Sequence, residues 1–320
     1  MDVLSDVLQV IRLSGGMLFR ASFGAPWSII TSGAEHVMRQ LPLSARRAIV
    51  FHVVVRGTCW VHCAPDSPRR LVEGEAVVLP RCDVHVLGDD PDRTPVPTEA
   101  LLKGTPLREL REISYGGRGR ETEILCGFLS CDQADFAPLF AALPPLFCVP
   151  LHGTGKMPAL NPLLDYAVRE IVSDAEGAGS ARLRVAELLF VEALRRYMAV
   201  LPADEVGWLA GLRDPVVGRA LGLMHADPCH PWTVSELAMQ AAVSRSSLAA
   251  RFSQLLGEPP MQYLARWRLL LAARHLHDGE RSIATVAESV GYDSPAAFQR
   301  AFKRLRGETP AAFRKRLRAN

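Results

Sequence analysis

The chain of 320 residues carries 37 Lys and Arg against 34 Asp and Glu, and 48% of its residues are hydrophobic. This length exceeds what one ordinary hydrophobic core fills, so two domains are expected. No apolar run approaches the roughly 18–20 residues that a membrane span needs, and the acidic, amphipathic N-terminus lacks the basic segment of a secretory signal. The composition therefore excludes a membrane protein and predicts a cytoplasmic one.

The net charge of +3 is unevenly distributed along the chain. Residues 214–320 contain 15 Lys and Arg against 9 Asp and Glu, whereas residues 1–213 contain 22 against 25. A basic C-terminal region on an acidic body favours a polyanionic partner, although charge alone is equally typical of an ordinary basic surface. The seven cysteines stand at irregular positions without a CxxC pair. They indicate free thiols in a reducing compartment rather than a structural zinc site.

Short apolar runs separated by turn residues dominate the first part of the chain. They predict strands over residues 48–55, 59–63, 76–79, 84–87 and 123–129. β-Branched residues at this spacing indicate a small barrel or sandwich. The polar segment 89–119, rich in Gly, Pro and Arg, is predicted to be a long loop.

Two helices are predicted to follow the strands. Asn161 is expected to cap the first, which runs to Asp174 with Pro162 at its first position. The second helix, over residues 181–200, has an unusually broad apolar face. That face either packs on the barrel or contributes to a homodimer formed through residues 162–200.

A repeat occupies the last third of the chain. We expect an N-terminal domain over residues 1–200, a linker over 201–213 and a C-terminal domain over 214–320. In the last of these, two short amphipathic helices joined by a tight turn occur twice. Their apolar faces are Val234, Leu237, Ala238 and Ala241 with Leu248, Phe252 and Leu255, and then Ile283, Val286, Ala287 and Val290 with Phe298, Phe302 and Leu305. This pattern predicts a tandem helix-turn-helix whose halves are joined by a long helix from Pro259 to near Gly279.

Positive charge flanks the second helix of each pair. Arg245 and Arg251 stand in the first, and Arg300, Lys303, Arg304 and Arg306 stand in the second. Such side chains can contact phosphates while the exposed helix face contacts base edges. A plain helical bundle with basic solvated faces is the alternative interpretation.

Three segments of residues 214–320 carry a recognisable pattern. They are Gly257-Glu-Pro-Pro-Met-Gln-Tyr-Leu-Ala-Arg-Trp-Arg, Ala287-Glu-Ser-Val-Gly-Tyr-Asp-Ser-Pro-Ala-Ala-Phe-Gln-Arg and Gly307-Glu-Thr-Pro-Ala-Ala-Phe-Arg. With them the region resembles the DNA-binding domain of AraC/XylS-type regulators. The resemblance implies a sequence-specific transcription regulator that binds promoter DNA in the major groove. The implied base-facing residues are Ser246, Ala249 and Ala250 in the first unit and Pro295, Ala296, Gln299 and Arg300 in the second.

The N-terminal half carries a second pattern. Phe51-His-Val-Val-Val-Arg-Gly-Thr-Cys-Trp is followed by a segment in which Gly74, Pro80 and His85 have the spacing of a cupin motif, with Cys82 in place of its usual glycine. This half resembles the cupin-type sensor domain of one branch of the same regulators. The companion cupin motif is largely absent, and only His52 lies in its region. The two resemblances together imply an α+β chain, with a cupin-like β-barrel and flanking helices before an all-α tandem helix-turn-helix domain.

Several residues of the expected barrel are candidates for sensing. His52, Trp60 and His85, bordered by Cys82, are the candidate effector-binding residues, because polar and aromatic groups in aliphatic strands find partners in a pocket. His52, His85 and Cys82 are also the candidate metal ligands, so a metal-dependent cupin enzyme fused to a DNA-binding module is an alternative. Satisfied structural histidines are the simplest interpretation of the pair.

A thiol redox sensor is a further alternative for the N-terminal half. Cys82 stands beside Arg81, whose positive charge favours the thiolate, and Cys59 and Cys63 project to the same face of one strand. Small buried hydrophobes are the more common role of free cysteines.

The sequence shows no nucleophile–base constellation and no phosphate-binding glycine loop. We therefore expect a protein that is not an enzyme. DNA binding is expected to require no cofactor, and a metal in the barrel is not expected. The expected partners are double-stranded promoter DNA, RNA polymerase and a small-molecule or redox effector.

Overall fold

The computed structural model describes residues 2–11, 13–40, 47–102, 104–106, 109–131, 137–151, 160–173, 175–202, 204–279 and 281–319. The chain divides into two compact units. Residues 13–134 and 143–201 form the first, called here the sheet unit. Residues 1–12, 135–142 and 202–320 form the second, called here the helical unit.

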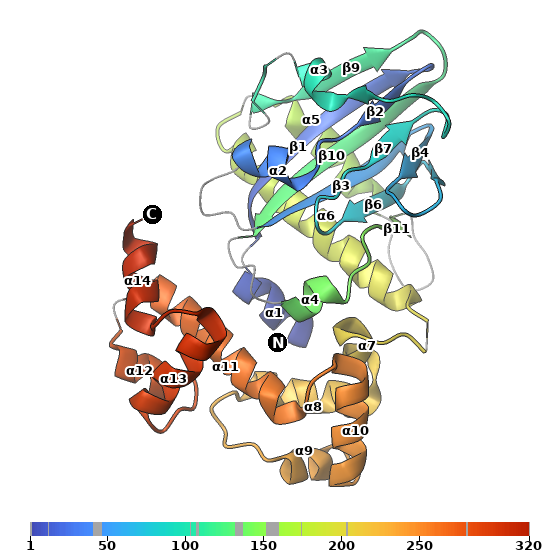
Figure 1. Cartoon of the computed structure of the whole chain (residues 1–320). Coiled ribbons are helices and arrows are strands. Elements are labelled where there is room, and N and C mark those ends of the chain that lie inside the picture. The colour runs from blue at the N-terminus through green and yellow to red at the C-terminus, as the bar shows by residue number, and fades with distance from the viewer. Residues whose placement is uncertain are drawn as a thin grey trace. The chain divides into compact units, whose positions relative to one another are not determined.

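Within the described residues, the sheet unit contains one β-sheet of six strands and one of five (Figure 1). The first has the order β11 (Phe147–Pro150), β6 (Glu75–Leu79), β3 (Arg47–Arg56), β10 (Glu121–Cys131), β1 (Leu13–Gly24) and β9 (Glu112–Gly116). The second has the order β5 (Arg69–Val72), β4 (Thr58–His62), β7 (Val86–Gly88), β2 (Ser28–Ile30) and β8 (Val96–Pro97). β10 pairs antiparallel with β1 on one side and with β3 on the other, so these three strands form the centre of the larger sheet.

Side chains from both sheets form one hydrophobic core. Phe23 of β1 and Val54 of β3 contribute to it from the first sheet, and Val61 and Leu87 contribute from the second. Successive residues of a strand point to opposite faces. His52, two residues before Val54, therefore points into this core.

Helices α2 (Gly33–Gln40), α3 (Thr98–Leu102), α5 (Asn161–Ile171) and α6 (Ala178–Val200) belong to the same unit. α6 packs against β1, β6, β10 and β11, and its Leu189, Phe190 and Leu194 are buried. The broad apolar face of this helix thus packs on the first sheet. Asn161 does not cap α5, because Leu160 occupies the capping position and no side chain caps the helix. Asp174 lies outside the described residues.

The sheet unit differs from the sequence prediction in two segments. The sequence predicts no strand before residue 48, yet β1 and β2 lie there. Residues 89–119, predicted to be a loop, include β8, α3 and β9. β9 pairs with β1 at the edge of the sheet and buries only Ile113. An edge strand with one buried side chain lacks the alternation of apolar residues by which strands are recognised.

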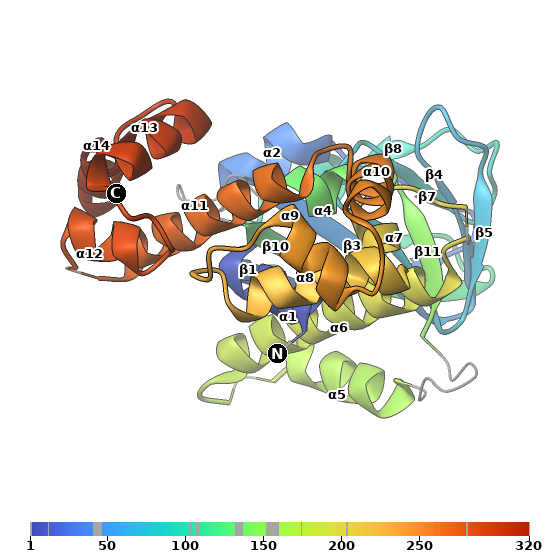
Figure 2. The same cartoon turned by 90° about the horizontal axis from the view of Figure 1, so that it is seen from below.

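The helical unit contains the predicted tandem repeat. Its helices are α1 (Val3–Ile11), α4 (Ala137–Ala141), α7 (Trp208–Arg213), α8 (Pro215–Ala226), α9 (Val234–Gln240), α10 (Arg245–Leu256), α11 (Pro260–Asp278), α12 (Ile283–Glu288), α13 (Pro295–Arg306) and α14 (Pro310–Ala319). α9 and α10 form the first helix-turn-helix, and α12 and α13 form the second. In both views α11 extends from the group α8–α10 to the group α12–α14 (Figure 2). No helix of the described residues is long and apolar enough to span a membrane.

α11 contributes to both halves of this unit. On its first part, the Trp267 ring stacks on His225 of α8 with ring centroids 4.0 Å apart. On its second part, Leu269 and Leu276 belong to a core cluster with Phe298 and Phe302 of α13. Leu305, which the helical spacing predicts to face inward, is instead 42% exposed.

Two helices outside residues 214–320 also belong to the helical unit. α7 lies in the expected linker, where Trp208 is buried and its indole N–H donates to the Tyr263 hydroxyl at 3.1 Å. α1 packs against α8 and α11, and Asp6 Oδ2 lies 3.6 Å from Nδ1 of His225. Residues 208–213 of the expected linker therefore form a helix of the helical unit. The first helix of the chain is grouped with the tandem helix-turn-helix repeat rather than with residues 13–134 and 143–201.

Ile11→Ala should destabilise the helical unit, because Ile11 is 1% exposed and its loss leaves a cavity under α1. Truncations of this kind cost about 2–5 kcal/mol. Hydrogen exchange of the full chain should therefore show faster exchange of the α8 and α11 amides. Gln9→Ala, at an exposed position of the same helix, is the control. Unchanged protection of α8 and α11 in Ile11→Ala would show that α1 does not support them.

Candidate nucleic-acid interface

Local interactions fix the start of the second helix in each pair. The Ser244 hydroxyl accepts a hydrogen bond from the Ser247 N–H at the start of α10, and the Ser294 hydroxyl does the same for Ala297 at the start of α13. Serine is a favoured residue at such positions because its oxygen satisfies an otherwise unpaired N–H. The turn within the second pair contains Gly291 with φ of +77°, a conformation that favours glycine.

α10 has small side chains at its predicted reading positions. Leu248 and Phe252 anchor it in the first half of the helical unit, and both are fully buried. Ser246 and Ala250 are exposed and Ala249 is half-buried. Arg245 is exposed at the start of the helix and has no hydrogen-bond or ion-pair partner among the described residues.

Arg251, expected at the DNA backbone, is exposed but forms an ion pair within the protein. Its Nε donates to Asp214 Oδ2 at 2.7 Å. The other carboxylate oxygen of Asp214 accepts from the N–H groups of Val216 and Val217 at the start of α8. Asp214 thus caps α8 and also binds the guanidinium of Arg251. The local pattern of α10 could not show this partner, because Asp214 lies 37 residues away.

α13 presents a larger and more basic surface. Phe298 and Phe302 are fully buried and hold the helix in the second half. Besides Leu305, its exposed side chains are Pro295, Ala296, Gln299, Arg300, Lys303 and Arg304. Among the described residues, Gln299, Arg300 and Lys303 have no hydrogen-bond or ion-pair partner. The sequence-predicted reading residues of this helix therefore lie together on one accessible surface.

Arg306 does not share that surface. Its guanidinium lies over the Phe313 ring, 5.3 Å from the centroid. Burial, with the nearby charge of Arg316, lowers the pKa of Arg306 to about 10. This side chain packs α13 against α14 instead of extending towards a nucleic acid.

In the sheet unit, the predicted His52 and His85 meet inside the core. Their Nε2 atoms lie 2.9 Å apart, and both side chains are buried. His52 Nδ1 lies 3.1 Å from Cys126 Sγ, and His85 Nδ1 lies 2.9 Å from the Asp83 carbonyl oxygen and 2.9 Å from the Thr31 hydroxyl. The pair was predicted from the cupin pattern, but Cys126 and Thr31 were not among the predicted site residues.

The proton positions of the pair follow from its outer partners. A carbonyl oxygen only accepts, so the His85 Nδ1 carries a hydrogen and donates it to Asp83. Burial lowers the pKa of His85 to about 4, so the ring is neutral and its Nε2 accepts from the His52 Nε2–H. Burial, with His85 beside it, lowers the pKa of His52 as well. The His52 Nδ1 then accepts from the thiol of Cys126, whose pKa is raised by burial.

The other two predicted effector-binding residues do not join this pair. Cys59 and Val61 belong to the core, so Trp60 between them points away from it. Cys82 is buried, and burial with the charge of Asp83 raises its pKa to about 12. Arg81, expected to favour the thiolate, donates instead to the Leu143 carbonyl at 3.1 Å. Among the described residues, no group of three or more His, Cys, Asp and Glu is arranged to hold a metal ion.

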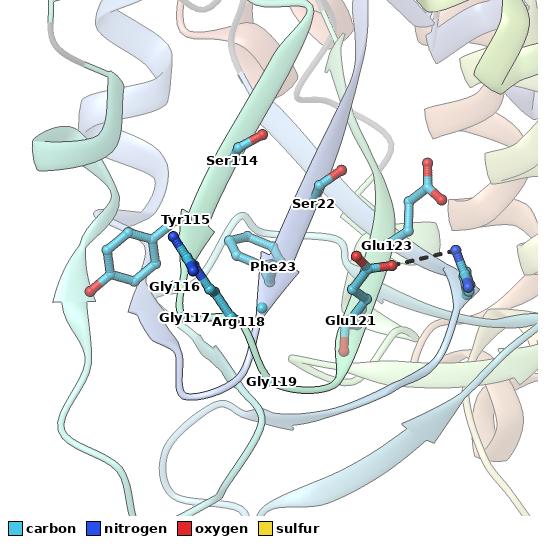
Figure 3. Close-up of a pocket in the computed structure, with 13 residues that line it drawn as sticks. Ser22, Phe23, Ser114, Tyr115, Gly116, Gly117, Arg118, Gly119, Glu121 and Glu123 are labelled. Atoms are coloured by element: carbon cyan, nitrogen blue, oxygen red, sulfur yellow. Dashed lines mark ion pairs between the residues drawn. The ribbon is translucent and has the colours of Figure 1, made fainter.

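A polar hollow of about 550 Å³ lies where β1 and β9 end and β10 begins (Figure 3). Ser22 and Ser114 lie on neighbouring strands, with Tyr115 and Arg118 to one side and Glu121 and Glu123 to the other. The glycines of its wall allow close backbone contact. Gly117 N–H donates to the Gly24 carbonyl at 2.6 Å, and a Cβ at Gly24 would lie 2.0 Å from the Gly117 oxygen. This hollow was missed because residues 89–119 were predicted to be a loop.

Two basic helix-turn-helix units on one chain, together with a β-sheet domain, define a DNA-binding transcription regulator. A family model described as cupin matches residues 2–199, and one described as helix-turn-helix domain matches residues 237–316. AraC-like transcription regulators of Streptomyces antibioticus and Streptomyces lividans are each 34% identical over 316 residues, covering 98% of this chain and 99% and 98% of theirs. The chain belongs to the AraC-like transcription regulators, with an N-terminal cupin domain.

A solved structure is similar to the C-terminal part of the chain. It is the DNA-binding domain of AdpA in complex with a target DNA, with 34% sequence identity and a TM-score of 0.32. The similarity covers 33% of this chain and 95% of that one.

The histidine pair should make the stability of the sheet unit depend on pH. Both pKa values are lower in the folded state, so the unfolded chain takes up protons first as the pH falls from 6.5 towards about 4. The free energy of unfolding should fall in this window by about 1.4 kcal/mol per pH unit for each histidine. Chemical denaturation at several pH values measures it. The double variant His52→Gln/His85→Gln should show a shallower dependence, and an unchanged slope would contradict the assignment.

Proposed function

We propose that the two reading helices of this regulator divide the work of DNA recognition. α13 reads base edges, and α10 contacts mainly the DNA backbone. The contrast between the exposed side chains of the two helices carries the proposal. It assumes that both helices lie in the major groove, as in the helix-turn-helix arrangement generally.

The exposed surface of α10 offers little chemistry for reading bases. Methyl groups of Ala249 and Ala250 neither donate nor accept hydrogen bonds, and at most they contact a thymine methyl. The Ser246 hydroxyl lies 3.1 Å from that of Ser244, so it is partly engaged in the cap. Arg245 is a cation of this surface without a partner among the described residues, and it stands at the helix start where phosphates approach. Arg251 acts indirectly, because its ion pair with Asp214 holds α10 against α8.

α13 carries side chains that can distinguish bases. Gln299 can form two hydrogen bonds with adenine and Arg300 two with guanine, each pair worth about 1–3 kcal/mol of discrimination. Lys303 and Arg304 follow one turn later and can contact the backbone beside the groove. Direct readout is therefore concentrated in the second unit.

Arg300→Ala should relax base preference at one or two positions, because a bidentate contact to a base is lost. Arg245→Ala should weaken all sites about equally and lower the salt dependence, because a phosphate contact is lost. Both are measured by binding to a set of operators that differ by single base pairs. Lys315→Ala, an exposed cation of α14, controls for net charge. A uniform loss of affinity with Arg300→Ala would assign that residue to a phosphate and contradict the proposed reader.

We propose further that the sheet unit senses an effector and does not catalyse a reaction. In the described part of its core, both imidazoles have hydrogen-bond partners on both nitrogens. Burial raises the pKa of Cys59 and of Cys82 to about 12, so these thiols stay protonated. General base catalysis, nucleophilic catalysis and metal binding all require a group that is free to react. These observations favour a structural role for the histidine pair over an enzymatic or redox one.

The hollow of Figure 3 offers a better effector site than the core. Arg56 lies 3.5 Å from Glu121, and Arg20 lies 3.2 Å from Glu123, so both carboxylates have a counter-ion. Arg118 has no such partner among the described residues. Its positive charge favours a small anionic effector, and the hydroxyls of Ser22 and Ser114 can orient it. We propose this site in place of the interior set His52, Trp60, Cys82 and His85.

Ser114→Trp should abolish effector binding, because the indole fills the hollow. A library of small carboxylates and phosphates can be screened for compounds that raise the melting temperature of the wild type. Those compounds should fail with Ser114→Trp and still act on Glu73→Trp, a control at an exposed position outside the hollow. Compounds that stabilise both variants equally would place the effector site elsewhere.

Two further partners remain predictions. A transcription regulator acts on promoters through RNA polymerase, and we propose that contact here. A homodimer through residues 162–200 would cover Tyr166, Val172 and Leu188, which are 41%, 56% and 46% exposed. Tyr166 lies on α5, Val172 directly follows that helix, and Leu188 lies on α6. Exposed apolar side chains of this kind are typical of a surface that a second copy can bury.

A further inference from the structure

One arginine joins the two halves of the helical unit. Arg268 of α11 donates from Nε to the Pro228 carbonyl at 2.6 Å and from Nη2 to the His230 carbonyl at 2.8 Å. From Nη1 it donates to the Gly291 carbonyl at 3.2 Å. Pro228 and His230 lie in the loop between α8 and α9, which leads into the first helix-turn-helix. Gly291 lies in the turn between α12 and α13, within the second.

The loop and the turn also touch each other directly. The Cys229 thiol lies 3.1 Å from the Ser289 carbonyl oxygen. A Cβ at Gly291 would lie 2.9 Å from the Cα of Cys229 and 3.0 Å from the guanidinium carbon of Arg268. Glycine is therefore needed here for close approach as well as for its positive φ. The contact leaves no room for the two segments to slide without breaking hydrogen bonds to Arg268.

The position of Arg268 on α11 suits it to this bridging role. Trp267 packs on His225 in the first half, and Leu269 belongs to the core of the second half. Arg268 lies between them, at the boundary of the two cores. A guanidinium is planar and has five donors in fixed directions, so it can bind several carbonyl groups at once and hold their relative positions. Lysine has one flexible ammonium group and cannot reproduce this geometry.

We infer that Arg268 is a positioning residue that fixes the distance and rotation between α10 and α13, and so selects operators by the spacing of their two contact sites. The inference rests on the proposed function, in which both helices contact DNA. One base pair of added spacing moves a site by about 3.4 Å and about a tenth of a turn along the duplex. A rigid protein loses one of its two contacts on such DNA. A protein whose halves can shift keeps both contacts and loses less affinity.

Arg268→Lys tests this inference and keeps the charge. An operator is first selected from random DNA with the full-length wild type, and variants are made with one base pair inserted or deleted between the two contacted segments. The wild type should bind the altered operators about tenfold or more weakly than the selected one. We call the affinity for the selected operator divided by that for an altered operator the spacing ratio. Arg268→Lys should bring the spacing ratio close to one while keeping the base preferences within each segment. A ratio unchanged from the wild type would overturn the inference.

Two further variants make the outcome specific. Arg266→Lys changes an arginine on the same helix whose partner, Glu258, lies in the first half, and it should keep the wild-type ratio. Gly291→Ala forces the turn away from Cys229, so it should lower the spacing ratio as Arg268→Lys does. If one of these two variants fails to fold, the other still tests the inference. If Gly291→Ala folds and keeps the full spacing ratio, the contact does not set the register. Failure of the proposed function shows separately, as a wild type that protects only one DNA segment.

Discussion

The arrangement of the exposed side chains of α10 and α13 depends on one constraint. A single helix, α11, is shared between two hydrophobic cores. α11 buries Tyr263, Leu264 and Trp267 in the first half and Leu269 and Leu276 in the second. Neither α10 nor α13 is long enough to be stable alone, because helices shorter than about 12–15 residues are marginal in water. Their positions follow from Phe252, Phe298 and Phe302, which tie them to these cores. The exposed side chains are free for DNA because packing is satisfied on the opposite face.

Buried histidines occur in both units, and in each case the cost of burial is offset by hydrogen bonds. His52 and His85 share a line of partners from Thr31 to Cys126 in the sheet unit. In the helical unit, the Tyr263 hydroxyl lies 2.8 Å from Nε2 of His225 and accepts from Trp208. Burial lowers the pKa of His225 to about 3, so this ring is also neutral. Neutral, paired imidazoles give a core its specific arrangement, since each ring fits only one set of partners.

Local patterns made the helical unit predictable, and their absence explains what was missed. The spacing of Leu248 and Phe252 and the cap at Asp214 are signals within one turn or two, so they can be recognised from the sequence. The partner of Arg251 and the three carbonyl groups bound by Arg268 lie 23 to 40 residues away in the chain. Strand alternation could place His52 in the core, and the same alternation turns Trp60 out of it. The hollow depends on a parallel edge pairing of β9 with β1, for which no local signal exists.

The grouping of α1 with the C-terminal helices has a consequence for biosynthesis. α1 ends at Ile11, whereas its partner α8 begins at Pro215, so about two hundred residues are made between them. During synthesis the apolar face of α1 leaves the ribosome long before the surface that covers it. All strands of the sheet unit are made before α8 and α11, so this unit can fold first. Such distant contacts slow the final folding step. A chain that ends after residue 201 thus contains the whole sheet unit but leaves the first helix uncovered. Because it lacks both helix-turn-helix units, it cannot compete with the finished protein for promoter sites.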